Sequence, residues 1–121
     1  MKIEGDAKLL RIFVGETDHH HSINVYEKIV TEARKAGMAG ATVFKGIMGF
    51  GGTSRIHTSK ILRLSEDLPL IIEIVDELAK IEKFLPLVDK IMEEANAGGL
   101  ITIEKADIIK YKSVKKESSS G

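Results

Sequence analysis

The residues best suited to bind a ligand are glycines that share one short segment: Gly46, Gly49, Gly51 and Gly52. Closely spaced glycines let backbone N–H groups approach an anion such as a phosphate. The spacing is that of a nucleotide phosphate-binding loop, but Gly52 stands where such a loop carries its lysine, and no clear helix follows. The segment therefore indicates an anion site without triphosphatase chemistry. A hairpin turn that needs positive φ angles is the equally supported alternative.

The distribution of charge around these glycines favours the anion site. The chain has 18 Lys and Arg residues and 18 Asp and Glu residues, so its formal net charge is zero. No acidic residue lies between Glu32 and Glu66, whereas basic side chains occur throughout this stretch: Arg34, Lys35, Lys45, Arg55, His57, Lys60 and Arg63. A local excess of positive charge favours a phosphate-bearing ligand over a solvated basic loop. The neutral total argues against a general nucleic-acid-binding protein.

Three consecutive histidines, His19, His20 and His21, follow Glu16 and Asp18. Imidazole and carboxylate groups are ordinary ligands of zinc and nickel. Adjacent histidines in a polar loop rarely converge on one ion, so we favour a surface loop and expect no metal requirement. The chain has no cysteine, and its serines and carboxylates show no catalytic partner, so we expect no enzymatic activity.

Hydrophobic periodicity predicts the elements that must position these residues. Short apolar runs favour strands at 7–15, 40–48, 68–75, 100–104 and 106–112. Three-to-four spacing of apolar residues predicts amphipathic helices from Asn24 to Gly37 and from Asp76 to Gly99. This order predicts an α+β fold, a ferredoxin-like βαββαβ sandwich with both helices on one face of the sheet and an extra C-terminal strand.

The predicted helix ends rest on capping residues. Asn24 with Glu27 three positions later fits a capping box, and Gly37 fits a C-terminal cap. Asp76 is expected to cap the second helix. Pro86 should kink or split that helix, because proline lacks the N–H donor and clashes with the preceding turn. A polar loop is expected over residues 16–22.

The third predicted strand is apolar on both of its faces. Alternation places Leu70, Ile72 and Ile74 on one face and Ile71 and Val75 on the other. Two helices cover only one face of a four-stranded sheet, and a large exposed apolar patch is unusual for a monomer. The sequence therefore predicts a homo-oligomer.

The length of 121 residues fits one domain, which we expect to span 1–113 and to be followed by a disordered tail at 114–121. No apolar run approaches the roughly 20 residues that span a bilayer, and the N-terminus lacks the apolar core of a secretory signal. We therefore expect a soluble, cytoplasmic protein.

Three segments resemble the PII signalling proteins: residues 40–51 (GATVFKGIMGFG), 68–77 (LPLIIEIVDE) and 108–112 (IIKYK). More closely, residues 8–112 resemble a PII-like branch of uncharacterised function in bacteria and archaea. The resemblance implies a homotrimer whose sheets pack inward, with an adenine nucleotide in the clefts between subunits. The loop at 52–63 lacks tyrosine, which excludes PII-style uridylylation.

The resemblance also implies the nucleotide-binding residues. Gly49, Phe50 and Gly51 would approach the phosphates, while Thr42, Glu73 and Val75 would lie near the adenine. The remaining contacts would come from the loop residues Gly52, Arg55, His57 and Lys60, from Gly98 and Gly99, and from Lys110 and Lys112. Lysines cannot make the bidentate contacts of arginine, and Leu100 replaces a PII lysine, so AMP or ADP is favoured over ATP.

The expected function is that of a PII-like sensor. The nucleotide would order the loop at 52–63, and this loop would regulate a partner protein such as a membrane transporter or channel. No nucleic acid and no direct insertion into a membrane are expected. The alternative is a trimeric divalent-metal-responsive protein resembling the cation-tolerance family, which would use His19, His20, His21 or His57.

Overall fold

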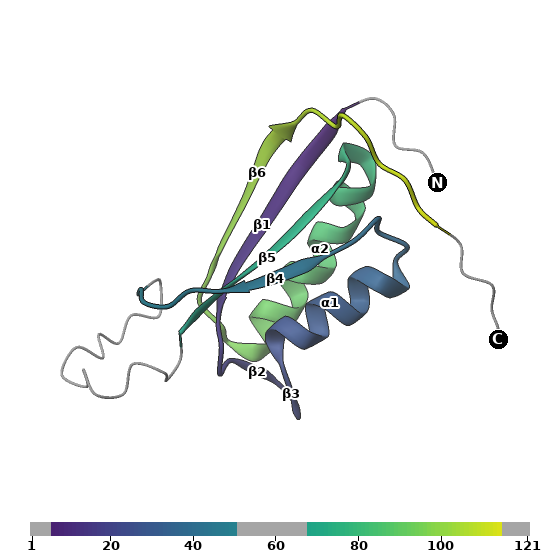
Figure 1. Ribbon diagram of the computed structural model, residues 1–121. Coiled ribbons are helices and arrows are strands. Elements are labelled where there is room, and N and C mark those ends of the chain that lie inside the picture. The colour runs from purple at the N-terminus through teal and green to yellow at the C-terminus, as the bar shows by residue number, and fades with distance from the viewer. Residues whose placement is uncertain (1–5, 51–67, 115–121) are drawn as a thin grey trace.

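The computed structural model of the chain describes residues 6–50 and 68–114 (Figure 1). Its elements follow in this order: β1 (Ala7–Gly15), β2 (His19–His20), β3 (Ile23–Asn24), α1 (Val25–Lys35), β4 (Thr42–Lys45), β5 (Pro69–Glu77), α2 (Leu78–Ala95) and β6 (Leu100–Ala106). The expected loop at 52–63 lies outside the described residues, and so does the expected tail from residue 115 onward.

A four-stranded antiparallel sheet forms the framework, with the strand order β4-β5-β1-β6. The two longest strands pair at the centre of the sheet, where Ile12 lies opposite Ile72. Both helices lie on the same side of this sheet (Figure 1). This arrangement confirms the predicted ferredoxin-like α+β fold.

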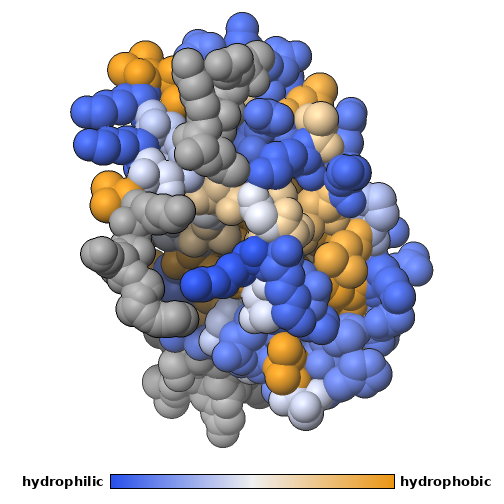
Figure 2. All heavy atoms as spheres, turned by 90° about the vertical axis from the view of Figure 1, so that its right-hand side faces the viewer, coloured by the Kyte–Doolittle hydropathy of each residue, from blue (hydrophilic) through white to orange (hydrophobic). Residues whose placement is uncertain are grey.

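The core lies between the helices and the sheet face that they cover. Alternate residues of β1 and β5 point into it, because successive side chains of a strand point to opposite faces. These strand residues and their helical partners are all buried: Leu10, Ile12, Val14, Leu70, Ile72, Ile74, Ile29, Ile81 and Val88. Figure 2 shows the right-hand side of Figure 1, where hydrophilic residues surround a group of hydrophobic residues in the middle of the face.

The opposite face of the sheet, which we call the outer face, carries a row of apolar side chains across all four strands. Phe13 is opposite Ile71 and Leu100, and Phe44 is opposite Ile71. Phe44 retains 48% and Leu100 retains 56% of its accessible surface. The central strands are therefore apolar on both faces, as predicted, and neither helix covers the outer row.

The second helix differs from its prediction at two places. It runs unbroken from Leu78 to Ala95, so Pro86 does not split it. Pro86 has no N–H, so the carbonyl of Glu82, one turn earlier, lacks its hydrogen-bond partner within the helix. Both residues are exposed, so water can bond that carbonyl instead. The helix ends before the glycine pair because Asn96 adopts the left-handed conformation at φ 54° and donates its N–H to the Glu93 carbonyl.

Three local predictions are wrong, and a fourth is only partly confirmed. Asp76 belongs to β5 rather than capping α2, whose N-cap is Glu77. Asn24 is the N-cap of α1, as predicted, but its side chain makes no capping hydrogen bond, so the expected capping box does not form. The expected polar loop over residues 16–22 contains the short strand β2, which pairs with β3 directly after the loop. Residues 107–114 form no strand, so the monomer lacks the extra C-terminal strand within the part of the chain described.

Gly99 is required by close packing. A Cβ atom at this position would lie 2.5 Å from the carbonyl oxygen of Phe13 and would also overlap the Met92 side chain. We expect Gly99→Ala to lower the free energy of unfolding by about 1–3 kcal/mol, because the Phe13 backbone is hydrogen-bonded within the sheet and cannot move away from the added methyl group. Gly40→Ala is the control, because no atom lies within 4 Å of its Cβ position. Equal urea midpoints for both variants would contradict the packing role.

Candidate functional site

A cavity of about 570 Å³ opens beside the start of β4, the end of β5 and the segment that follows β6. Its lining contains four residues that the sequence analysis assigned to nucleotide binding: Thr42, Glu73, Val75 and Lys110. The rest of the lining is mostly small or apolar and includes Ala39, Ala41, Ile108 and Tyr111. We call this space the β4–β5 cavity. It combines an apolar wall with a few polar groups, as small-molecule sites do.

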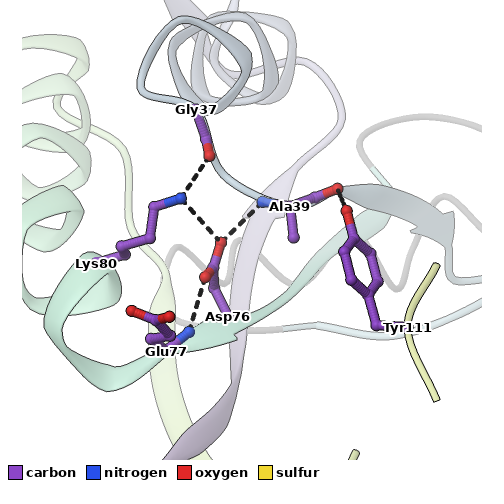
Figure 3. Close-up of polar contacts among 6 residues, drawn as sticks. All are labelled: Gly37, Ala39, Asp76, Glu77, Lys80 and Tyr111. Carbon is purple, nitrogen blue, oxygen red and sulfur yellow. Dashed lines mark hydrogen bonds and ion pairs between the residues drawn. The ribbon is translucent and has the colours of Figure 1, made fainter. Parts of the chain in front are cut away.

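A buried carboxylate holds one wall of the β4–β5 cavity in place (Figure 3). Asp76 has no accessible surface, and its Oδ2 accepts the N–H of Ala39 at 2.8 Å. Its Oδ1 accepts the N–H of Glu77, also at 2.8 Å. Lys80 Nζ lies 3.9 Å from Oδ2 and donates to the Gly37 carbonyl at 2.7 Å. Asp76 thus ties the turn between α1 and β4 to the start of α2.

The segment after β6 closes the cavity from the other side. The hydroxyl of Tyr111 donates to the Ala39 carbonyl at 3.3 Å. The backbone of Ala39 is therefore held at both of its polar groups, with its N–H bonded to Asp76 and its carbonyl bonded to Tyr111 (Figure 3). The sequence analysis did not predict Tyr111 as a site residue. The resembling segment at 108–112 contains it, which is the signal that could have found it.

An ion-pair row on the outer face fixes Glu73, one of the cavity residues. Arg11 donates from Nε to Glu73 at 2.8 Å and from Nη1 to Glu104 at 2.7 Å, which links three strands. The hydrogen bond to Glu73, with Glu104 nearby, raises the pKa of the Arg11 guanidinium above its ordinary value. Glu73 therefore forms an ion pair with Arg11 and also lines the β4–β5 cavity.

The remaining predicted residues lie elsewhere. Gly49 and Phe50 follow β4 beyond Lys45, which pairs with Leu70 near the start of β5, whereas the cavity lies toward the end of β5. Gly99 lines a second cavity of about 510 Å³ beside the C-terminal turn of α2. Gly98 and Lys112 line neither cavity. Among the residues that the structure describes, a single chain therefore does not bring all the predicted ones together.

The glycine-rich segment is only partly available to an anion. The N–H of Gly46 donates to the Pro69 carbonyl at 2.7 Å, so it is not free. A Cβ at Gly46 or Gly49 would meet the Pro69 ring at 2.9 or 3.1 Å. These two glycines therefore allow the segment after β4 to pack closely against Pro69 at the start of β5. The predicted residues Gly51, Gly52, Arg55, His57 and Lys60 lie outside the described residues.

Two cations of the acid-free stretch are paired with carboxylates from outside it. Lys45 Nζ lies 3.1 Å from Glu16, and Lys35 Nζ lies 3.5 Å from Glu32. Glu32 also binds Lys28, and that contact is the main reason why its pKa is lowered. The local excess of positive charge is consequently smaller than the sequence suggests.

The histidine run contacts the end of α2, which the sequence did not predict. His20 Nε2 lies 2.7 Å from Oε1 of Glu94, and the hydrogen bond lowers the pKa of the Glu94 carboxyl, with Lys90 adding to the effect.

No helix within the described ranges combines the length and the apolar content that crossing a membrane would need.

Comparison with known sequences places the chain in a family. The family model DUF190, with the description "Uncharacterized ACR, COG1993", matches residues 7–108. A UPF0166 protein of Aquifex aeolicus (strain VF5) is 39% identical over 102 residues, which are 84% of this chain and 92% of the relative. A UPF0166 protein of Methanocaldococcus jannaschii is 38% identical over 104 residues, 86% of this chain and 93% of the relative.

Solved structures share the fold at low sequence identity. CPII, a nitrogen regulatory PII-like protein from Thiomonas intermedia K12 whose structure holds ADP, AMP and bicarbonate, matches with a TM-score of 0.60 and 17% identity, covering 88% of this chain and 92% of CPII. A PII-like signalling protein from Thermus thermophilus matches with a TM-score of 0.56 and 14% identity, covering 84% of this chain and 87% of that protein. These findings confirm the resemblance seen in the sequence: the chain belongs to the DUF190 (UPF0166) family and has a PII-like, ferredoxin-like fold.

Proposed function

We propose that this protein is a PII-like signalling module that binds an adenine nucleotide, AMP or ADP, without turning it over. The observation that carries the proposal is the β4–β5 cavity, which gathers Thr42, Glu73, Val75 and Lys110. The resemblance to PII proteins assigned each of these residues to nucleotide binding. The shared fold with CPII, whose structure holds ADP and AMP, supports the same ligand class.

The lining of the cavity suits a nucleotide of low phosphate number. Apolar side chains such as Val75 and Ile108 offer surface for the faces of a purine, and the Thr42 hydroxyl can donate to or accept from its edge. Lys110 supplies one positive charge, which acts on a phosphate as a point charge rather than as a bidentate clamp. Few phosphate contacts therefore favour AMP or ADP over ATP.

We propose a homotrimer in which neighbouring subunits complete the site. Gly49, Phe50 and Gly99 lie at the opposite end of the sheet from the cavity, so they can reach its nucleotide only from an adjacent chain. The apolar row of Phe13, Ile71, Phe44 and Leu100 supplies a surface that association would remove from water. The metabolic signal would then pass through the loop at 52–63 to a partner protein in the cytoplasm.

Replacing Lys110 by alanine is expected to weaken ADP binding about 10-fold or more, because a hydrogen bond to a charged group contributes about 1.5–3 kcal/mol. Isothermal titration of the full chain with AMP, ADP and ATP measures this. Lys105→Ala is the matched control, since Lys105 is exposed on β6 and does not line the cavity. If the wild-type protein binds none of the three nucleotides, or if both variants bind ADP alike, the assignment of this cavity is wrong.

A further inference from the structure

Two neighbouring histidines and a glutamate meet where the β2–β3 hairpin touches the last turn of α2. His20 Nε2 lies 2.7 Å from Glu94 Oε1, and only 8% of His20 is exposed. The ring of His21 lies edge-on to that of His20, with 4.4 Å between the centroids. One ligand atom from each of these three residues lies within 4.8 Å of the other two. We call them the His–His–Glu cluster.

The backbone at His21 explains how adjacent histidines converge. Side chains of successive residues in an extended strand point to opposite faces, so the regular geometry of β2 alone would not bring His20 and His21 together. His21 has φ 61°, and it is the first residue of the two-residue turn between β2 and β3. The turns that close such hairpins need a positive φ at this position and usually place glycine or asparagine there. A histidine here accepts backbone strain and keeps an imidazole beside His20.

A purely structural role accounts for only part of the cluster. The hydrogen bond to Glu94 satisfies a ring nitrogen of buried His20, and this contact needs nothing from His21. The second imidazole, held in a strained conformation at an exposed position, adds no further hydrogen bond to that pair. Two imidazoles and one carboxylate are, however, a common ligand set for a borderline-soft divalent ion.

We propose that the His–His–Glu cluster binds a divalent transition-metal ion of the zinc class. Ligand atoms at about 2.0–2.2 Å from a tetrahedral ion are about 3.4 Å apart, so an ion entering the cluster would lengthen the 2.7 Å separation of His20 Nε2 and Glu94 Oε1 and shorten any separation near the 4.8 Å limit of the cluster. His21 and Glu94 are both exposed and can rotate to achieve this, while buried His20 stays fixed. The ion would tie the hairpin to α2 and keep a fourth position open for water or another ligand.

Titration of the full chain with Zn²⁺, with no nucleotide present, tests this site independently of the proposed function. We expect one Zn²⁺ per chain with a Kd in the micromolar range or below, and no response to Mg²⁺, which prefers oxygen ligands. His21→Gly and Glu94→Gln should each weaken Zn²⁺ binding about 100-fold or more, because each removes a direct ligand. His19→Ala should change it less than about 2-fold, since His19 lies outside the cluster.

A melting curve distinguishes lost metal binding from lost folding. Glycine adopts the φ of 61° without strain, so metal-free His21→Gly should melt at or above the wild-type temperature. Zn²⁺ should raise the Tm of the wild-type protein and of His19→Ala but not that of His21→Gly. Absence of Zn²⁺ binding by the wild-type protein, wild-type affinity in His21→Gly and Glu94→Gln, or equal weakening in His19→Ala would each overturn the proposal.

Discussion

Asp76→Ala is expected to lower the free energy of unfolding by about 2–4 kcal/mol. The carboxylate is fully buried and accepts the N–H groups of Ala39 and Glu77, and each unsatisfied buried donor costs about 1–3 kcal/mol. Lys80 also loses the Asp76 carboxylate at 3.9 Å, although it keeps the Gly37 carbonyl. Urea unfolding at one fixed protein concentration measures the change, since association would make stability depend on concentration.

Two companion variants show whether the loss comes from these hydrogen bonds. Asp76→Asn keeps one acceptor oxygen and should lose less stability than Asp76→Ala. Asp89→Ala removes an exposed carboxylate from α2 and should change stability by no more than about 0.5 kcal/mol. A loss in Asp76→Ala no larger than that of Asp89→Ala would show that the carboxylate does not hold the turn. Because Ala39 also lines the β4–β5 cavity, weaker ADP binding should accompany the lost stability.

Ile71→Lys is expected to convert the proposed trimer into monomers. Ile71 lies at the centre of the apolar row on the outer face, opposite both Phe13 and Phe44. Three lysines brought together at an interface would have to leave water without a partner charge, which costs several kcal/mol for each ion. Sedimentation velocity at micromolar concentration measures the change in mass.

Ile23→Lys is the matched control for the oligomer. Ile23 is an exposed isoleucine in the β2–β3 hairpin, away from the outer face, so this variant should keep the wild-type mass. A monomeric wild-type protein would contradict the proposed trimer, and an unchanged mass in Ile71→Lys would show that association uses another surface. Circular dichroism of Ile71→Lys should stay at the wild-type level, because its side chain lies outside the core.

The identity and order of the main elements could be predicted from the sequence. Period-two and period-three-to-four patterns depend on which face of each element is buried, and the burial of Leu10, Ile12 and Ile72 follows those patterns closely. The ends of elements were less accurate. At Asn96 a left-handed residue other than glycine ends the helix, and at Pro86 solvent exposure lets the helix continue.

The candidate nucleotide site was only partly accessible from the sequence. Its resemblance to PII proteins named Thr42, Glu73, Val75 and Lys110, and the structure places all four around one cavity. Nothing in the linear pattern connects Asp76 with the turn at Ala39. The linear pattern also does not show that Gly49, Phe50 and Gly99 lie at the opposite end of the sheet from the cavity. That separation follows from the register in which the strands pair.

By itself, the sequence determined the α+β fold, the two-faced central strands and the family, since each of these depends on local periodicity or on a linear motif. Tertiary structure alone decided which distant groups meet: Asp76 with Ala39, Arg11 with Glu73 and Glu104, and His20 with Glu94. The physical reason is that such contacts depend on antiparallel pairing and helix packing between segments tens of residues apart. A hydrophobic pattern specifies that a face is buried, but it does not specify which polar group of another segment will lie against it.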